Sequence, residues 1–336
     1  MTATAIADHK YIAELAANEY VDGVYAIQNA QLGQTKNGKP FLKCLLADKT
    51  GRTPGRMWNI DEALFNTLPT DGFVWIAGQS QPYQGEVQII VQQVRPHEPT
   101  DRELAELLPS TRHDVDEMFA EVVRLLDTLQ HPACQALASA YLSDGELMQA
   151  FCQAPAAREI HHAYLGGLLE HTLGLMRLAD AVCPLYPDLS RDVVLFGLFL
   201  HDLGKTREMT WQRGLGYAPD GELVGHIARG VTMLQQKVAE LASDPADPVQ
   251  VPAEMVRVFE HVLLSHHGIP EYGALKVPAT PEAILIHYLD NIDAKMNIAL
   301  TECRDADTLS NKAPGDFTEK IWALGTRLYR PDVAKV

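Results

Sequence analysis

Residues 191–205 read RDVVLFGLFLHDLGK and place His201 and Asp202 at the end of an apolar run. This periodicity predicts a buried helix over residues 190–203, and the run is too short to span a bilayer. An imidazole or a carboxylate without partners would be costly in such a setting. We therefore expect His201 and Asp202 to meet other polar groups inside the fold.

Similar settings recur in the second half of the chain, where nine of the 13 histidines fall between residues 161 and 287. His171 lies in LLEHTLGL, His226 in LVGHIARG, the pair His266-His267 in LLSHHGIP, and Asp290 in HYLDNIDAKM. Imidazole and carboxylate ligands together suit Mn, Fe, Zn, Ni or Co, so a convergence of these groups predicts a transition-metal site. A carboxylate that bridges two ions would also allow a metal-bridging hydroxide to attack a phosphodiester in line.

The surrounding sequence has helical periodicity. Helices are predicted over residues 115–129, 133–142, 145–152, 162–182, 190–203, 225–241, 253–266 and 281–300. No strand pattern recurs there apart from a short turn near residues 211–217. The sequence thus predicts an all-α domain over residues 113–310, followed by a C-terminal helix over 311–336.

The N-terminal part is predicted to be β-structure. Short β-branched and aromatic runs cover residues 21–26, 41–47, 52–58, 73–78 and 86–94, with turn residues between them and a helical stretch at 60–66. Five strands with a helix after the third is the order of a small OB-type barrel. We assign residues 1–97 to this domain and the polar residues 98–112 to a linker, which makes the chain an α+β multidomain protein.

Positive charge is concentrated on two predicted strands of the barrel and the turn between them. Barrels of this type bind single-stranded nucleic acid by combining a basic groove with aromatic stacking platforms. The alternative is that the aromatic rings fill the barrel and the lysines are solvated. The candidate nucleic-acid contacts are Lys36, Lys39, Phe41, Lys43, Arg52, Arg56 and Trp58.

Composition narrows the protein class. The chain has 336 residues with 46% hydrophobic and 21% charged residues, which is typical of a globular protein of two domains. The net charge of −16 argues against an unspecific coat on duplex DNA. Residues 1–97 carry eight basic and nine acidic residues, so most of the acidic excess lies beyond them. Five scattered cysteines and the lack of a signal-peptide pattern predict a soluble cytoplasmic protein.

The order of the metal-binding candidates points to a known family. His171, then His201-Asp202, then Asp290 form the pattern H…HD…D, which resembles the HD-domain phosphohydrolases. The stretches HHAYLGGLLEHT, LFLHDLGK, LLSHHG and DNIDAKMN, behind an OB-like domain with NGKPFL, are similar to the YhaM-type 3′–5′ exoribonucleases. The resemblance covers about residues 20–305.

The resemblance implies a ligand set and an activity. It implies that His171, His201, Asp202 and Asp290 bind one divalent ion, and that Asp202 bridges to a second. The second ion would be held also by His226, His266 and His267. It further implies manganese-supported hydrolysis of phosphodiesters from a 3′ end, with release of nucleoside 5′-monophosphates. Relatives with three metals carry a glutamate where this chain has Gly167, so a third ion is not expected.

Other polar residues near these motifs have open roles. Lys205, one turn beyond His201, is expected to hold a phosphate oxygen by its charge, the alternative being a solvated lysine at a helix end. His161 and His162 are candidates for capping, for supporting a ligand from behind, or for ligation. His287 is a candidate for orienting Asp290. Asp293, one turn after Asp290, is equally open.

Three functions remain in competition at this point. The leading hypothesis is a metal-dependent 3′–5′ exoribonuclease that captures strands on the OB domain, with single-stranded DNA as a further substrate. The second is an HD phosphodiesterase of nucleotides or cyclic oligonucleotides, although the GYP motif of cyclic-di-GMP hydrolases is replaced by Gly268-Ile269-Pro270. The third is an inactive HD scaffold that carries a nucleic-acid-binding OB module. A homo-oligomer is compatible with each of them.

Overall fold

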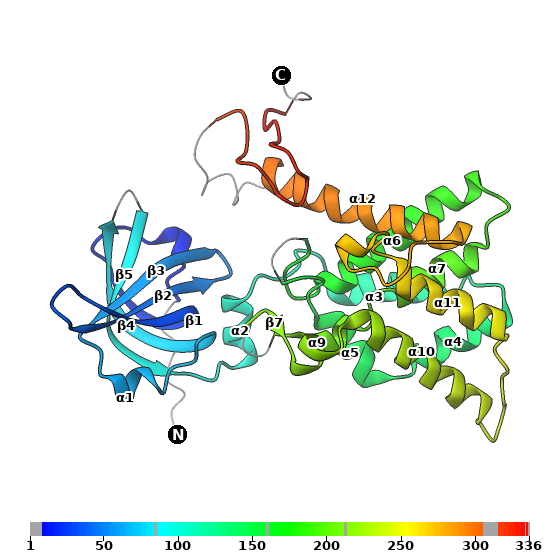
Figure 1. Cartoon of the computed structure of the whole chain (residues 1–336), viewed down its shortest axis with the longest axis horizontal. Helices are drawn as coiled ribbons and strands as arrows, with labels where there is room; N and C mark the ends of the chain where they lie inside the picture. The colour runs from blue at the N-terminus through cyan, green and yellow to red at the C-terminus, as the bar shows by residue number, and fades with distance from the viewer. Residues whose placement is uncertain are drawn as a thin grey trace. The chain divides into compact units, whose positions relative to one another are not determined.

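A computed structural model describes residues 9–83, 86–158, 161–211, 214–304, 315–332 and 334 (Figure 1). The chain divides into two compact units. The first comprises residues 1–110 with 211–215, and the second comprises residues 111–210 and 216–336. Within the described residues, no helix is both long enough and apolar enough to cross a membrane.

The first unit is a closed five-stranded barrel. Its strands are β1 (Tyr20–Gln34), β2 (Pro40–Asp48), β3 (Gly51–Trp58), β4 (Gly72–Tyr83) and β5 (Glu86–Pro96). They close in the order β1-β2-β3-β5-β4, and only the β3–β5 pair is parallel. A helical turn, α1 (Glu62–Phe65), lies between β3 and β4 and is capped by the Asp61 side chain. This strand order with its helix is that of an OB fold, as the sequence predicts.

Alternation along the strands decides which side chains face the barrel core. On β2, Leu42, Cys44 and Leu46 are buried inside, while Phe41 and Lys43 point outward. The first strand is longer than predicted. It continues to Gln34 through a bulge between Gln28 and Gln31, because its polar end still pairs with β2 through the backbone.

The predicted linker contains a helix that belongs to the first unit. Helix α2 (Asp101–Leu107) begins with a capping box, in which Thr100 and Glu103 bond each other's backbone N–H groups. Lys49 on the β2–β3 turn forms an ion pair of 2.6 Å with Glu106 on α2. The first unit therefore extends to Ser110 instead of ending at residue 97.

The second unit is helical. Its longer helices are α3 (Val115–Leu126), α4 (Pro132–Leu142), α5 (Gly145–Gln153), α6 (Gly167–Val182), α7 (Arg191–Leu200), α10 (His226–Ala242), α11 (Ala253–Ser265) and α12 (Pro281–Arg304). Short elements join them: 3-10 turns at Cys183–Leu185 and Pro270–Tyr272, α8 (Lys205–Glu208), α9 (Pro219–Leu223), and the two-residue strands β6 (Met209–Thr210) and β7 (Gly216–Tyr217). Helix α7 is buried along its length except at Arg191 and packs against α6, α11 and α12. Its ring Phe196 contacts Tyr141 and Phe259, with ring centroids 6.1 and 5.0 Å apart.

Two helix boundaries differ from the prediction for a steric reason. The helix predicted over 162–182 begins only at Gly167, because the chain turns tightly before it and a Cβ on Gly167 would lie 2.1 Å from the His162 carbonyl oxygen. The helix predicted over 190–203 ends at Leu200. A Cβ on Gly204 would lie 2.1 Å from the His226 carbonyl oxygen, so glycine permits the close approach of this loop to α10.

The predicted C-terminal helix is wrong for the residues that the structure describes. Phe317 pairs with Tyr329 and Ile321 with Thr326, so the segment 315–332 folds back on itself. Thr318 accepts a hydrogen bond of 2.9 Å from the Leu328 backbone at its hydroxyl, and Gly325 has a φ of +70°. These contacts replace helical hydrogen bonds. Residues 311–314, 333, 335 and 336 lie outside the described part.

Asp192 holds the N-terminal end of α7, the end opposite to His201 and Asp202. Its Oδ2 accepts hydrogen bonds of 2.6 Å from the backbone N–H groups of Gln130 and His131. We expect Asp192→Ala to lower the free energy of unfolding of the helical unit by about 2–3 kcal/mol, because two N–H groups lose a charged acceptor. Urea unfolding followed by circular dichroism at 222 nm measures this change. The exposed Asp188→Ala serves as control, and equal stability of both variants would contradict the expectation.

Candidate metal centre

The C-terminal end of α7 carries the two central residues of the site. His201 caps the helix and Asp202 follows it, with 0% and 2% of their surfaces exposed. Because α7 is buried on all sides, both side chains project into the interior of the helical unit. Each therefore requires polar partners there.

One group of partners faces Oδ2 of Asp202. His171 from α6 places its Nε2 3.3 Å from Nε2 of His201 and 3.3 Å from Oδ1 of Asp290 on α12. Nε2 of His201 also lies 3.3 Å from Asp202 Oδ2. The ligand atoms of His171, His201 and Asp290 lie within 4.8 Å of one another.

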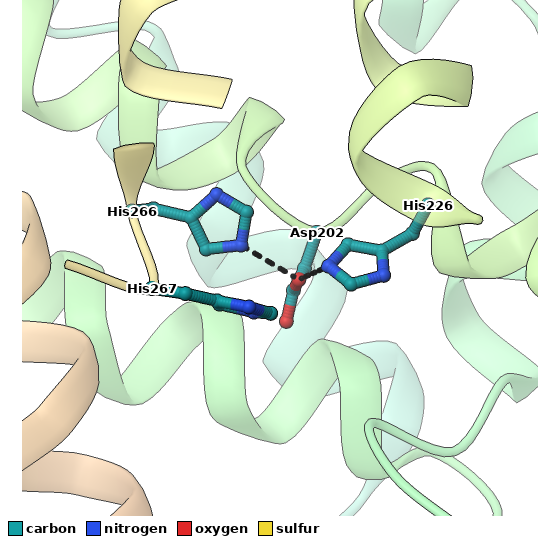
Figure 2. Close-up of side chains that lie close together, drawn as sticks. All are labelled: Asp202, His226, His266 and His267. Atoms are coloured by element: carbon teal, nitrogen blue, oxygen red, sulfur yellow. Dashed lines mark ion pairs between the residues drawn. The ribbon is translucent and has the colours of Figure 1, made fainter. Parts of the chain in front are cut away.

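A second group faces Oδ1 of the same carboxylate (Figure 2). His226 at the start of α10 and His266 at the end of α11 place their Nε2 atoms 3.5 and 3.6 Å from Asp202 Oδ1. His267 points to the same carboxylate, and the ligand atoms of all four residues lie within 4.8 Å of one another. The two oxygens of Asp202 thus face two separate groups.

The second group leaves buried polar atoms without hydrogen-bond partners. These atoms are Asp202 Oδ1, His226 Nε2, His266 Nε2 and His267 Nδ1. Polar atoms that are buried without a partner are rare in native proteins and call for an explanation. A divalent cation explains them, since metal–nitrogen and metal–oxygen bonds of about 2.0–2.2 Å separate neighbouring ligand atoms by roughly the distances found here.

In His201 and His266, the hydrogen bond on the side of the ring away from Asp202 shows which nitrogen is available to a metal ion. His201 donates from Nδ1 to the Leu198 carbonyl at 2.6 Å, and His266 does the same to Leu263 at 2.9 Å. A neutral imidazole carries only one N–H, so this donation leaves Nε2 with its lone pair directed inward. Such a lone pair is what a metal ligand requires.

Carboxylates orient the rings of His171 and His226. His171 donates from Nδ1 to Asp293 Oδ2 at 2.7 Å, and His226 donates from Nδ1 to Glu208 Oε1 at 3.0 Å. Glu208 also accepts from the His226 backbone N–H at 3.1 Å. Sequence analysis missed Glu208, because it lies six residues past Asp202 in the polar stretch KTREMT without periodicity or motif.

The structure gives the positions of the residues whose roles the sequence left open. Asp293 accepts from His171 and also from His162 Nε2 at 2.9 Å, and His162 Nδ1 lies 2.8 Å from the Tyr164 hydroxyl. His161 lies beside His171, with ring centroids 5.9 Å apart, and burial lowers the pKa of His161 to about 4. The expectation for His287 is corrected: its Nδ1 lies 2.9 Å from the His266 carbonyl, so it supports that loop and not Asp290.

Lys205 is paired within the site. Its Nζ lies 2.6 Å from Asp202 Oδ2, and only 8% of the residue is exposed. Burial opposes the ionisation of Asp202, but the ammonium of Lys205 together with the rings of His201 and His266 outweighs it and holds the pKa of Asp202 well below its usual range. The carboxylate is therefore ionised at neutral pH, as a metal ligand must be.

The barrel carries the other predicted residues. Phe41, Lys43, Arg56 and Trp58 lie side by side on the outer surface of β2 and β3, where Lys43 pairs with Arg56 and Phe41 with Trp58. The rings of Phe41 and Trp58 are 5.2 Å apart, and Trp58 is 43% exposed. Arg56 lies over the rings of Trp58 and of Tyr83, which the prediction did not include. Arg52 is exposed on β3, and Lys36 and Lys39 are exposed on the β1–β2 turn.

Comparison with known proteins assigns the helical unit. Residues 168–295 match the family model of the HD domain, and this range includes every residue of the two groups around Asp202. The helical unit contains an HD domain. HD domains are metal-dependent phosphohydrolase domains, and the two His/Asp groups are the places where this one could hold divalent ions.

Solved structures resemble other parts of the chain. One is the second OB-fold domain of replication protein A from Methanococcus maripaludis, with 21% identity over 27% of this chain and 96% of that one, at a TM-score of 0.21. Another is a replication protein A heterotrimer bound to ssDNA, with 18% identity over 27% and 66%, at 0.21. A third is the protein priB from Ralstonia solanacearum, with 12% identity over 24% and 100%, at 0.21. The assignment of the barrel rests on its own strand order.

The contact of Glu208 with His226 predicts an effect on metal binding. Glu208→Gln removes the negative charge that orients the ring and raises the basicity of Nε2. We expect the affinity for Mn²⁺ to fall by about 10–100-fold, as for other carboxylates behind a ligating histidine. Isothermal titration calorimetry of the metal-stripped protein measures this affinity. The exposed Glu222→Gln on α9 is the matched control, and equal affinities in the two variants would exclude this role.

The first group predicts a dependence of metal binding on pH. Burial disfavours the charged form of His171, but hydrogen bonds to Asp290 and Asp293 outweigh it and raise the pKa of His171 to about 9. Below pH 9 the ring therefore carries a proton that must leave before Nε2 can bind a cation. We expect the affinity for Mn²⁺ to rise from pH 6 to 9 with release of about one proton from this ring. Titrations in buffers of different ionisation enthalpy count the protons, and a pH-independent affinity would contradict the expectation.

Proposed function

We propose that the protein is a metal-dependent 3′–5′ exonuclease that degrades RNA, with single-stranded DNA as a further substrate, and releases 5′-mononucleotides. The observation that carries the proposal is the position of Asp202, whose two oxygens face two separate groups of histidines. One carboxylate between two ion sites is the arrangement expected of a two-metal phosphodiesterase. The OB-type barrel in the same chain supports a nucleic-acid substrate.

The ligand sets follow from the two groups. We assign His171, His201, Asp202 and Asp290 to the first ion, and Asp202, His226, His266 and His267 to the second. The predominance of imidazole favours transition metals over Mg²⁺ or Ca²⁺, which prefer oxygen ligands. We expect manganese as the working ion, with Fe, Ni, Co or Zn as possible replacements.

The protein's own residues prepare the site for a phosphodiester. When bound, two divalent ions supply positive charge that stabilises the phosphoryl group during displacement. Asp293 and Glu208 fix the rings of His171 and His226 from behind, and backbone carbonyls fix His201 and His266. Lys205 is buried beside Asp202, and we propose that its ammonium turns to a phosphate oxygen of the substrate.

The barrel supplies a binding surface for the strand. Exposed aromatic rings beside lysines and arginines are suited to stacking bases and to neutralising phosphates. In our proposal this surface holds a strand and raises the local concentration of its 3′ end at the HD domain. The five cysteines are all unpaired, which supports a reducing compartment such as the cytoplasm. We also propose that the protein acts as a homo-oligomer.

A labelled RNA tests the exonuclease. Metal-stripped protein restored with Mn²⁺ should convert a 5′-labelled single-stranded RNA into a ladder that shortens from the 3′ end. Asp202→Asn should slow this reaction on the order of 1,000-fold, because it removes the shared charge between both ion sites. His131→Gln, which changes a histidine at the start of α4, is the matched control and should retain activity.

Barrel variants separate the competing functions. Trp58→Ala should weaken binding of the RNA by about 5–150-fold, since base stacking contributes about 1–3 kcal/mol. Hydrolysis of bis(p-nitrophenyl) phosphate should stay unchanged, because this small ester needs only the HD domain. RNA that remains intact while cyclic or mononucleotide substrates are hydrolysed would replace the exonuclease by a small-nucleotide phosphodiesterase. RNA binding without turnover in any divalent metal would indicate a binding module.

A further inference from the structure

The segment before α6 holds one residue in an uncommon backbone conformation. His162 has a φ of +48°, which lies in the left-handed region that residues with a side chain rarely adopt. Its backbone N–H donates to Asn297 Oδ1 on α12 at 3.3 Å, and its carbonyl accepts from the Ala156 N–H at 3.1 Å. Such a conformation persists only where surrounding contacts impose it, and it is most frequent at functional sites. The contacts of the His162 side chain therefore call for an explanation.

Both ring nitrogens of His162 have partners. The residue is 5% exposed, its Nε2 lies 2.9 Å from Asp293 Oδ2, and its Nδ1 lies 2.8 Å from the Tyr164 hydroxyl. The same Oδ2 of Asp293 accepts from His171 Nδ1 at 2.7 Å. His162 therefore holds the carboxylate that orients His171, and Tyr164 holds His162.

The hydrogen bonds continue beyond Tyr164. Its hydroxyl donates to Glu170 Oε1 at 2.9 Å, and the Thr111 hydroxyl donates to the other oxygen of Glu170. A continuous series of hydrogen bonds thus leads from Thr111, the first residue of the helical unit, to the ring of His171. The side chains between these two ends are Glu170, Tyr164, His162 and Asp293. We call these four residues the His171 support chain.

The support chain borders a cavity. His162, Glu170 and Asp293 line a cavity of about 580 Å³, together with residues of α3 and α6. The side chains of Glu170 and Asp293 are 21% and 20% exposed. Water can compete for the oxygens of an exposed carboxylate, which makes any single hydrogen bond to it easy to exchange. The bond from His162 restricts Asp293 to the orientation that serves His171.

The support chain reaches only one of the two groups around Asp202. His171 belongs to the first group. In the second group, His226 is oriented by Glu208 and His266 by the Leu263 carbonyl. Within the part of the chain that the structure describes, no hydrogen bond joins the support chain to these two histidines. The two candidate ion sites therefore have separate supports.

We propose that Tyr164 and Glu170 are positioning residues of the first ion site. They act on His171 through His162 and Asp293, and they raise the affinity for the first ion without changing that for the second. This inference rests on the two-ion centre of the proposed function. Partners behind a metal-binding histidine fix its ring and raise its basicity. Here that support extends two residues further, because Asp293 borders a cavity and needs a fixed partner of its own.

Manganese binding tests the proposal without any substrate. Metal-stripped protein is titrated with Mn²⁺, and electron paramagnetic resonance counts the free ion at each step. Tyr164→Phe removes one hydroxyl and should lower the affinity for one of two ions by about 5–10-fold, near the lower end of the effect of losing a direct partner. Glu208→Gln, which acts behind His226, should weaken the other ion, and this assigns the two steps. Tyr186→Phe, at a tyrosine that is 56% exposed, is the matched control and should bind both ions unchanged.

Two substitutions of Glu170 provide a second measurement. Glu170→Ala removes the acceptor of the Tyr164 hydroxyl and should weaken the same ion as Tyr164→Phe. Glu170→Gln keeps an acceptor oxygen at this position and should retain most of the affinity, within about threefold of the unaltered protein. A merely structural role of these residues would lower both affinities together, along with the urea midpoint of the metal-free protein. Selective loss at an unchanged midpoint is the signature of positioning.

The outcomes separate this proposal from the exonuclease. Equal affinities in Tyr164→Phe and Tyr186→Phe, or equal weakening of both ions in Tyr164→Phe, would overturn the role of the support chain and leave the exonuclease standing. Selective loss of one ion in a protein that does not degrade RNA would support the chain and contradict the exonuclease. Binding of a single Mn²⁺ by the unaltered protein would contradict the two-ion centre and the selective effect together.

Discussion

The burial of one ionised carboxylate constrains the whole helical unit. Asp202 is 2% exposed, and an isolated charge at such depth would cost many kcal/mol. The fold meets this cost by directing residues from four other elements to its two oxygens: α6, α8, α10 and the end of α11. Lys205 neutralises part of the charge, and the free nitrogens around Oδ1 leave room for cations to neutralise the rest. The packing of these helices therefore depends on the buried charge of Asp202 as well as on the apolar core.

The hydrogen bonds that orient the histidine rings from the side away from Asp202 are as specific as the ring atoms that face it. Two rings are held by backbone carbonyls one turn earlier on their own helices, which any histidine at a helix end can reach. The rings of His171 and His226 depend on Asp293 and Glu208, which come from different elements. These carboxylates tie the orientation of each ligand to the packing of a neighbouring helix. A change in α12 therefore reaches His171 directly.

Much of the fold could be predicted from the sequence, because its periodicities are strong. The barrel strands alternate, the buried helix before His201 is apolar throughout, and Asn-Gly and Asp-Gly turns separate the strands. The predictions failed where a long-range contact decides a boundary. The close approach of His162 delays α6 to Gly167, and the ion pair of Lys49 with Glu106 joins α2 to the barrel. The C-terminal segment folds back through Thr318 and Leu328 instead of forming a helix.

The sequence by itself determined the residue types of the site and their order along the chain, because polar residues inside apolar helices are unusual enough to stand out. Only the tertiary structure decided how they combine. It showed that Asp202 faces both groups, that Glu208 takes part, and that His287 supports a loop instead of Asp290. The burial of individual residues on α12 required it as well, since Ile284 and Ile292 are exposed while Ile286 is buried on the same helix. Helical spacing defines faces, but only the packing of neighbouring helices decides which face remains open.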